Sequence, residues 1–336
     1  MTDDDVDYDL RRCQNMMQEA YARLPAFNPF SVDELRRVTA IVRAPWTEGG
    51  PTMKRIEEKH VGDYSTRIRI YYPEDSQILP ALIYIHGGGW TIFSLDTHDR
   101  LMREYADRGR IAVIGVDYSL SPEVKYPRAI NEIVSVVQWL RKQNSTELSI
   151  DLHRIAIGGD SAGANLSVAA NLYLRDLNEP VLTAQLLNYG VYDRVRSESN
   201  SCMRYDGPRY RLTVDEMHFF QKNYVRDERD FDDPLVCPLH ADLHGLPPSF
   251  LAIAECDVLA DENRAMAEAL RNANVEVEEH VYQGATHSFL EAVRIAAISD
   301  RALNETTCWL VQQLNREIKD SRQYHNTLPI NMCQPE

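Results

Sequence analysis

The chain has 336 residues, a hydrophobic content of 44% and a formal net charge of −15 at pH 7. This length fits one large domain or two smaller ones with a sizeable core, and the negative charge argues against nucleic-acid partners and anionic membrane surfaces. Residues 1–10 are acidic, unlike the basic start of a signal peptide, and the apolar runs are far shorter than the roughly 20 residues of a membrane span. We therefore expect a cytoplasmic protein with no membrane partner; the sequence leaves a homo-oligomer open.

The first third of the chain predicts helices followed by alternating strands and helices. Residues 1–50 have a helical pattern, in which Ser31 and Glu34 fit a capping box. Residues 66–72 alternate as a half-exposed strand does. Strand candidates at 81–86 and 111–117 then alternate with helix candidates at 97–108 and 128–143. This order predicts an α/β fold with a mainly parallel central sheet flanked by helices.

A glycine loop, His86-Gly87-Gly88-Gly89-Trp90, follows the strand candidate at 81–86. Consecutive glycines after a strand expose backbone N–H groups, which in acyl transfer can bind the oxyanion of a tetrahedral intermediate. We predict an oxyanion hole at Gly87, Gly88, Gly89 and Ala162, with Gly87 shaping the loop and the other three donating. His86 stands at a strand end, which favours a structural hydrogen bond over proton transfer.

The motif Gly159-Asp160-Ser161-Ala162-Gly163 fits G-x-S-x-G, the turn that holds a nucleophilic serine between a strand and a helix. Residues 154–157 before it have the pattern of a short buried strand, and residues 165–176 after it have helical spacing. The glycines allow that strand and helix to approach closely. We therefore predict that Ser161 is a nucleophile.

A polar insertion at residues 196–235 interrupts the alternation. Thr213 and Glu216 form a second capping box, which opens a helix that carries Met217 and Phe220. These two side chains either line a substrate site or pack against the N-terminal helices.

An acid and a histidine follow the last two strand candidates, at 249–255 and 275–282. Asp257 and His287 come directly after them, at the edge of the sheet where catalytic groups gather. The order Ser161, Asp257, His287 is that of α/β-hydrolases, so we predict a catalytic triad. Two other acids compete for this role: Asp160 beside the nucleophile, and Asp261, which we predict as a helix N-cap.

The chain resembles the hormone-sensitive-lipase-like (GDXG) family of serine esterases, and most of all its bacterial acetyl esterase branch. The resemblance is carried by the glycine loop, the nucleophile motif and the segments at 95–103, 113–123, 126–129, 246–248, 257–262 and 284–289. It implies an α/β-hydrolase fold with a helical cap, no cofactor, a preference for short acyl esters, and the triad Ser161, Asp257 and His287. Val258 stands where the family usually has proline, and Trp90 where the branch tends to have phenylalanine. Trp90, Met217 and Phe220 are our candidates for substrate contacts.

The resemblance and the element order together give a division of the chain. We expect N-terminal cap helices at 1–50, hydrolase core at 51–195 and 236–320, a cap insertion at 196–235 and a loose tail at 321–336. A final helix at about 298–319 should pack on the sheet through Leu303, Thr306, Leu310 and Leu314. None of the six cysteines forms a CxxC pair or stands at zinc spacing from a histidine, so we expect no metal.

The sequence therefore predicts a serine carboxylesterase that acts on small acetyl-type esters through an acyl-serine intermediate. One alternative is a dedicated deacylase of a single acylated metabolite or antibiotic. A second is a ligand-binding or regulatory protein on the same fold, because fold alone does not fix function.

Overall fold

The computed structural model describes residues 5–75 and 77–316. Its sheet has eight strands: β1 (Arg55–Val61), β2 (Thr66–Tyr72), β3 (Leu79–Ile85), β4 (Ala112–Asp117), β5 (Ile150–Asp160), β6 (Gln185–Asn188), β7 (Ser249–Cys256) and β8 (Val277–Thr286). The helices are α1 (Tyr8–Ala22), α2 (Val32–Thr47), α3 (Asp99–Gly109), α4 (Arg128–Arg141), α5 (Ser145–Leu148), α6 (Ala162–Asp176), α7 (Asn200–Tyr205), α8 (Val214–Tyr224), α9 (Ala260–Asn272) and α10 (Ala297–Leu314). None of these described helices is both long and apolar enough to cross a membrane. The tail predicted at 321–336 lies outside the described residues.

The strands lie in the order β1-β2-β4-β3-β5-β6-β7-β8. The pairs β1/β2 and β2/β4 are antiparallel, and every other neighbouring pair is parallel. Parallel neighbours need crossover connections, which the helices supply. The predicted α/β class with a mainly parallel sheet is therefore confirmed.

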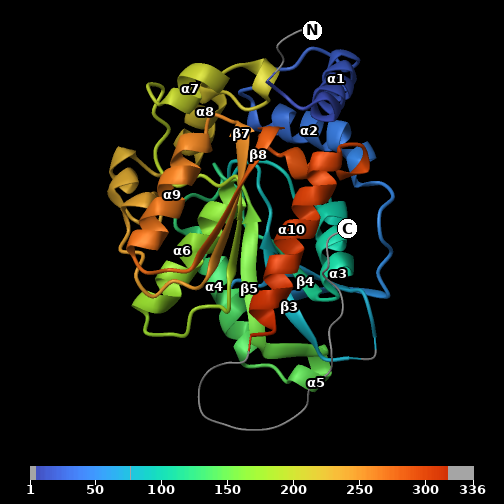
Figure 1. Ribbon diagram of the computed structural model, residues 1–336, viewed down its shortest axis with the longest axis vertical. Coiled ribbons are helices and arrows are strands. Elements are labelled where there is room, and N and C mark those ends of the chain that lie inside the picture. The colour runs from blue at the N-terminus through green and yellow to red at the C-terminus, as the bar shows by residue number, and fades with distance from the viewer. Residues whose placement is uncertain (1–4, 76, 317–336) are drawn as a thin grey trace.

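Helices cover both faces of this sheet (Figure 1), with α4, α6 and α9 on one face and α3 and α10 on the other. Alternation along β3 shows why: Ile83 and Ile85 enter one core, and Leu82 and Tyr84 enter the other. All four side chains are fully buried, as expected for a central strand covered on both sides. The predicted packing of the last helix is also confirmed, because the four residues named for its inner face are buried in α10.

Four further helices, α1, α2, α7 and α8, gather beyond the carboxyl ends of the parallel strands, at the top of Figure 1. The capping box of α8 is confirmed: the Thr213 hydroxyl accepts the Glu216 N–H at 3.1 Å, and Glu216 accepts the Thr213 N–H at 2.9 Å. The box predicted at Ser31 is wrong. Ser31 precedes α2, but its side chain caps nothing, and the Glu34 carboxylate instead accepts the Asn28 N–H at 2.9 Å.

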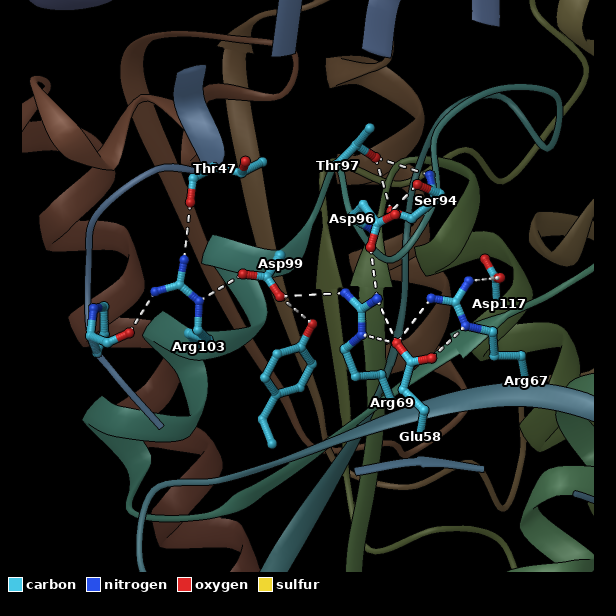
Figure 2. A network of polar contacts seen from close by, with 12 residues as sticks. Thr47, Glu58, Arg67, Arg69, Ser94, Asp96, Thr97, Asp99, Arg103 and Asp117 are labelled. Carbon is cyan, nitrogen blue, oxygen red and sulfur yellow. Dashed lines mark hydrogen bonds and ion pairs between the residues drawn. The ribbon is translucent and has the colours of Figure 1, made fainter. Parts of the chain in front are cut away.

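A network of charged side chains ties the end of α2 to the antiparallel edge of the sheet (Figure 2). Arg69 on β2 contacts Glu58 on β1 and the Asp96 carboxylate, each at about 2.7 Å. Farther along, Arg103 on α3 binds Asp99 at 2.8 Å and donates to the Thr47 carbonyl at the end of α2 at 3.0 Å. The network therefore fixes the position of the C-terminal end of α2 relative to this edge of the sheet.

Candidate active site

Ser161 occupies a strained turn between β5 and α6. Its φ of 54° and ψ of −120° fall where side chains other than glycine are rare, and such strain is found at functional sites. A Cβ added at either Gly159 or Gly163 would collide with the Ile85 carbonyl oxygen of β3. Because neither glycine has a Cβ, the strand and helix pack closely on β3 and present the serine at the end of the sheet.

His287 joins Ser161 and Asp257 in one hydrogen-bonded row. Its Nε2 lies 2.9 Å from the Ser161 Oγ, and its Nδ1 lies 2.7 Å from the Asp257 Oδ2. The Leu259 N–H donates to the other Asp257 oxygen at 3.1 Å, which fixes the carboxylate. Asp257 is 1% exposed and His287 6%, so water competes little for these bonds. The pairing requires a proton on Nδ1 and leaves Nε2 to accept the serine proton.

Asp160 faces away from the histidine, as predicted for this competing acid. Its Oδ1 accepts the Tyr84 hydroxyl at 2.9 Å and the Gly87 N–H at 3.1 Å, and its Oδ2 lies 3.4 Å from the His98 Nε2. Burial raises the pKa of Asp160, but the contacts with His98 and Tyr84 outweigh it and lower the pKa to about 2. The carboxylate therefore stays ionised and holds the glycine loop against β5.

Asp261 also does not belong to the row of Ser161, His287 and Asp257, although its predicted role as an N-cap is wrong. Helix α9 begins at Ala260 with Leu259 as its N-cap residue, so Asp261 lies inside the first turn. Its carboxylate accepts the Ser201 N–H at 2.9 Å, a bond between distant segments that no local pattern encodes.

The glycine loop, residues 86–90, lies beside Ser161. Gly88 and Gly89 have φ values of +111° and +56°, and both border the same cavity as the serine. Gly87 cannot serve as an oxyanion donor, because its N–H already donates to Asp160. That contact gives Gly87 the loop-shaping part of its predicted role, and the N–H groups of Gly88, Gly89 and Ala162 remain as candidate donors.

His86 supports the loop and takes no part in the row of three. Its Nδ1 lies 2.7 Å from the Gly87 carbonyl oxygen, and its ring stacks on Tyr118 with 4.5 Å between centroids. Burial, reinforced by His98, lowers the pKa of His86 to about 3, so the ring is neutral near pH 7. The Tyr118 hydroxyl donates to the His86 carbonyl at 3.0 Å, which braces the same loop.

Arg36 of α2 clamps the end of this loop, and the sequence patterns did not reveal it. Its Nη1 and Nη2 each donate to the Glu123 carboxylate at 2.8 Å. The same guanidinium donates to the backbone carbonyls of Thr91 and Ser121, each at 2.8 Å. Glu123 belongs to a motif quoted above, but its partner lies in α2, too far along the chain for a local signal.

A cavity of about 450 Å³ opens beside Ser161 and His287. Met217 and Phe220 of α8 line it and are also buried in the adjoining hydrophobic core, so both of the roles left open for them remain. Trp90 does not line it, which contradicts its prediction as a substrate contact. Its ring stacks on Tyr224 with 4.4 Å between centroids and an interplanar angle of 7°, so it packs beneath α8.

Two arginines at the cavity share one buried carboxylate. Arg43 of α2 contacts Glu291 at 2.5 Å, and Arg211 contacts the other oxygen of Glu291 at 3.0 Å. Arg43 also lies over the ring of Phe93, 3.8 Å from its centroid. The sequence gives only one sign of this cluster, which is that the charged Arg43 lies in α2 beside the buried Val38 and Val42.

Comparisons with known proteins agree with this fold. A family model described as alpha/beta hydrolase fold matches residues 82–291. Curated acetyl esterases of Salmonella paratyphi B and Salmonella choleraesuis are each 36% identical over 282 residues, which cover 82% of this chain and 85% of theirs. A solved hyperthermophilic esterase from the archaeon Pyrobaculum calidifontis superimposes with a TM-score of 0.84 at 31% identity, covering 91% of this chain and 98% of that one. An ester hydrolase from the metagenome of Lake Arreo gives 0.84 at 30%, with the same coverage.

A serine on a strained strand-to-helix turn, in a sheet of this topology, defines an enzyme of the α/β-hydrolase class. The chain belongs to the α/β-hydrolase family whose model matches residues 82–291. It is a serine carboxylesterase.

Proposed function

We propose that this enzyme hydrolyses short-chain, acetyl-type esters through an acyl-serine intermediate. The observation that carries the proposal is the row formed by Ser161, His287 and Asp257, with distances of 2.9 and 2.7 Å. The Salmonella relatives, which are called acetyl esterases, support the choice of acyl group.

The first half of the reaction acylates the serine. His287 Nε2 takes the hydroxyl proton as the Ser161 Oγ bonds to the ester carbonyl carbon, and the carbonyl electron pair moves onto its oxygen. The N–H groups of Gly88, Gly89 and Ala162 stabilise this oxyanion. As it collapses, the bond to the alcohol oxygen breaks, and His287 returns the proton to the leaving alcohol. Asp257 holds the imidazole in the required tautomer and stabilises its protonated form.

The second half releases the acid. His287 removes a proton from water, whose oxygen attacks the acyl carbon, and the same N–H groups hold the second oxyanion. Collapse breaks the bond to Ser161 Oγ, which regains its proton from His287. The step needs no cofactor.

Helices α1, α2 and α8 act in this proposal as a cap over the catalytic row, and we call them the cap helices. The support is their contribution to the cavity, through Met17, Leu35 and Phe220 among others. Such a cover excludes water from the acylation step and limits which esters enter.

The test is hydrolysis of aryl esters from acetyl to decanoyl, with Ser161→Ala as the control. We expect the highest kcat/KM for the shortest acyl chains and a loss of several orders of magnitude in the variant, as for removal of any triad nucleophile. A preference for the decanoyl ester would contradict the acyl assignment. An unlabelled serine after treatment with a fluorophosphonate would instead favour a binding protein on the same fold.

A further inference from the structure

The cavity beside Ser161 is much larger than an acetyl group requires. Its volume of about 450 Å³ lies in the range of sites that enclose drug-sized ligands. If the acyl group is acetyl, as proposed above, most of this space receives the alcohol portion of the ester. The residues that line the cavity therefore indicate the chemical nature of the alcohol portion.

Aromatic rings form much of these walls. Tyr21, Phe27 and Phe30 come from α1 and the segment that follows it, Phe93 from the region after the glycine loop, and Phe220 from α8. Rings bind other rings by edge and offset-stacked contacts in addition to the apolar area that they bury. This lining favours an alcohol with an aromatic body.

The polar end of the cavity holds two arginines that share one carboxylate partner. Arg43 and Arg211 both line the cavity, and the Glu291 carboxylate is their shared partner. The Arg43 side chain is 4% exposed, and its Nη2 forms an ion pair with the Glu291 Oε1. Within residues 5–75 and 77–316, neither the Arg43 Nη1 nor that Oε1 has a hydrogen-bond partner. The Nη1 of Arg211 has the Met17 sulfur at 2.7 Å, which is a weak acceptor.

The other titratable groups of the lining already have partners of their own. Glu216 is the only carboxylate among the described lining residues, and its Oε2 already accepts both the N–H and the hydroxyl of Thr213 at the start of α8. Its charge is thereby offset by the capping bonds and the positive end of that helix. His287 is paired with Asp257. A buried guanidinium with an unfilled donor is costly unless a partner arrives.

We propose that the substrate is an acetyl-type ester of an aromatic alcohol that carries a carboxylate, and that Arg211, supported by Arg43, binds this carboxylate. The guanidinium has planar donors that match a carboxylate in two parallel hydrogen bonds. The inference rests on the proposed function, because it assigns the cavity to the alcohol side. It makes Arg211 a specificity-determining residue outside the catalytic row.

The experiment compares matched esters that differ only in charge. The substrates are 3-(4-acetoxyphenyl)propanoate and the corresponding propanamide, with 4-acetoxybenzoate and 4-acetoxybenzamide as a shorter pair. The kcat/KM of each is measured for the wild-type protein, Arg211→Met, Arg211→Lys and a control, Arg141→Met. Arg141 is also in an ion pair, with Glu179 at 2.9 Å, but it lies at the end of α4, remote from the described cavity lining. Arg211→Met leaves Glu291 paired with Arg43, so no isolated buried charge is created.

We expect the wild-type enzyme to prefer the acid over the amide in at least one pair. Arg211→Met should lower that preference by roughly tenfold or more, as for a lost hydrogen bond to a charged group. Arg211→Lys should keep part of it, and Arg141→Met all of it. Thermal unfolding of each variant establishes that it is folded.

Two results would overturn the inference while leaving the proposed function intact. One is equal hydrolysis of acid and amide by the wild-type enzyme in both pairs. The other is an equal loss on acid and amide in Arg211→Met, which would make the arginines a structural link between segments and no more. If the wild-type enzyme hydrolysed none of the four acetyl esters, the proposed function would fail and this inference with it.

Discussion

The two regions that meet at Ser161 are built in different ways. On the sheet side, each proposed catalytic group stands directly after a strand: Ser161 after β5, Asp257 after β7 and His287 after β8. On the cap side, the walls come from α1 and α2, which are neighbours in the chain, and from α8, which follows only after β6 and meets them through tertiary contacts. The groups proposed for the chemistry therefore come from short local motifs, whereas the walls of the proposed substrate cavity depend on long-range packing.

Hydrogen bonding separates the two regions further. Ser161, His287 and Asp257 each have a partner at 3.1 Å or less, whereas on the cap side the buried Arg43 Nη1 has none among the residues that the structure describes. Groups whose hydrogen bonds are all made within the protein suit a reaction with fixed geometry. A group with an unfilled hydrogen-bond donor suits the binding of a ligand. Variants on each side should therefore have different signatures.

The largest effect is expected on the sheet side, from Asp257→Asn. The amide cannot hold His287 in the required tautomer, so kcat should fall by roughly 10⁴-fold with little change in KM. Asp261→Asn is the matched control, because its carboxylate binds the Ser201 N–H and has no contact with the histidine. Steady-state kinetics on an acetyl aryl ester provides the measurement. Equal losses in the two variants would contradict the assignment of the acid.

Asp160→Ala should have the next largest effect. It removes the acceptor of the Gly87 N–H and the Tyr84 hydroxyl, so the glycine loop loses its anchor to β5. We expect kcat to fall by about 10²-fold, comparable to the loss of one oxyanion donor, with KM nearly unchanged. Asp151→Ala, at the other end of β5, should leave kcat unaltered. A change confined to KM would show that Asp160 does not position the oxyanion hole.

On the cap side, Phe220→Ala should act on substrate size instead of on the reaction. Phe220 lines the cavity, whereas the adjacent Phe219 is not part of the described lining and contacts Phe30. We expect kcat/KM for a bulky aryl acetate to fall roughly tenfold, mainly through KM, and that for ethyl acetate to change little. Phe219→Ala should not discriminate between the two esters. An equal fall in kcat for both esters would contradict the separation of roles between the two regions.

The smallest effect concerns stability in acid. Burial, reinforced by His98, lowers the pKa of His86 from 6.5 to about 3, so between these values the unfolded chain binds a proton that the folded protein does not. The free energy of unfolding should therefore fall as the pH decreases from about 6.5 toward 3. Asp160 contributes in a lower window, since its pKa of about 2 lies below the ordinary 3.8. Denaturant unfolding between pH 7 and about 4 should show a flatter slope in His86→Gln than in the wild-type protein; an unchanged slope would contradict a neutral, buried His86.

Sequence patterns predicted the sheet side well because its signals are local. The strand at Thr66–Tyr72 has the bounds expected from its alternation, and the nucleophile turn lies between a strand and a helix as its motif requires. Because strands in a parallel sheet end at one edge, residues that follow different strands could be expected to meet. The four-residue β6 was missed, since so short a buried run has no clear period.

The cap side could not be predicted to the same depth. Glu34 bonds to the Asn28 N–H and leaves Ser31 without a capping partner, a choice between nearby acceptors that spacing alone does not decide. Trp90 stacks on Tyr224, a residue from a distant segment, and so leaves the substrate cavity to other side chains. The pairing of Arg43 and Arg211 on Glu291 joins three segments with no shared motif.

The account depends on covalent acylation of one side chain, and rapid-quench mass spectrometry during turnover of an acetyl aryl ester tests this most directly. We predict a transient acetyl adduct on the peptide that contains Ser161, absent from Ser161→Ala. Turnover by the wild-type protein with no adduct, or with the adduct on another residue, would contradict the account.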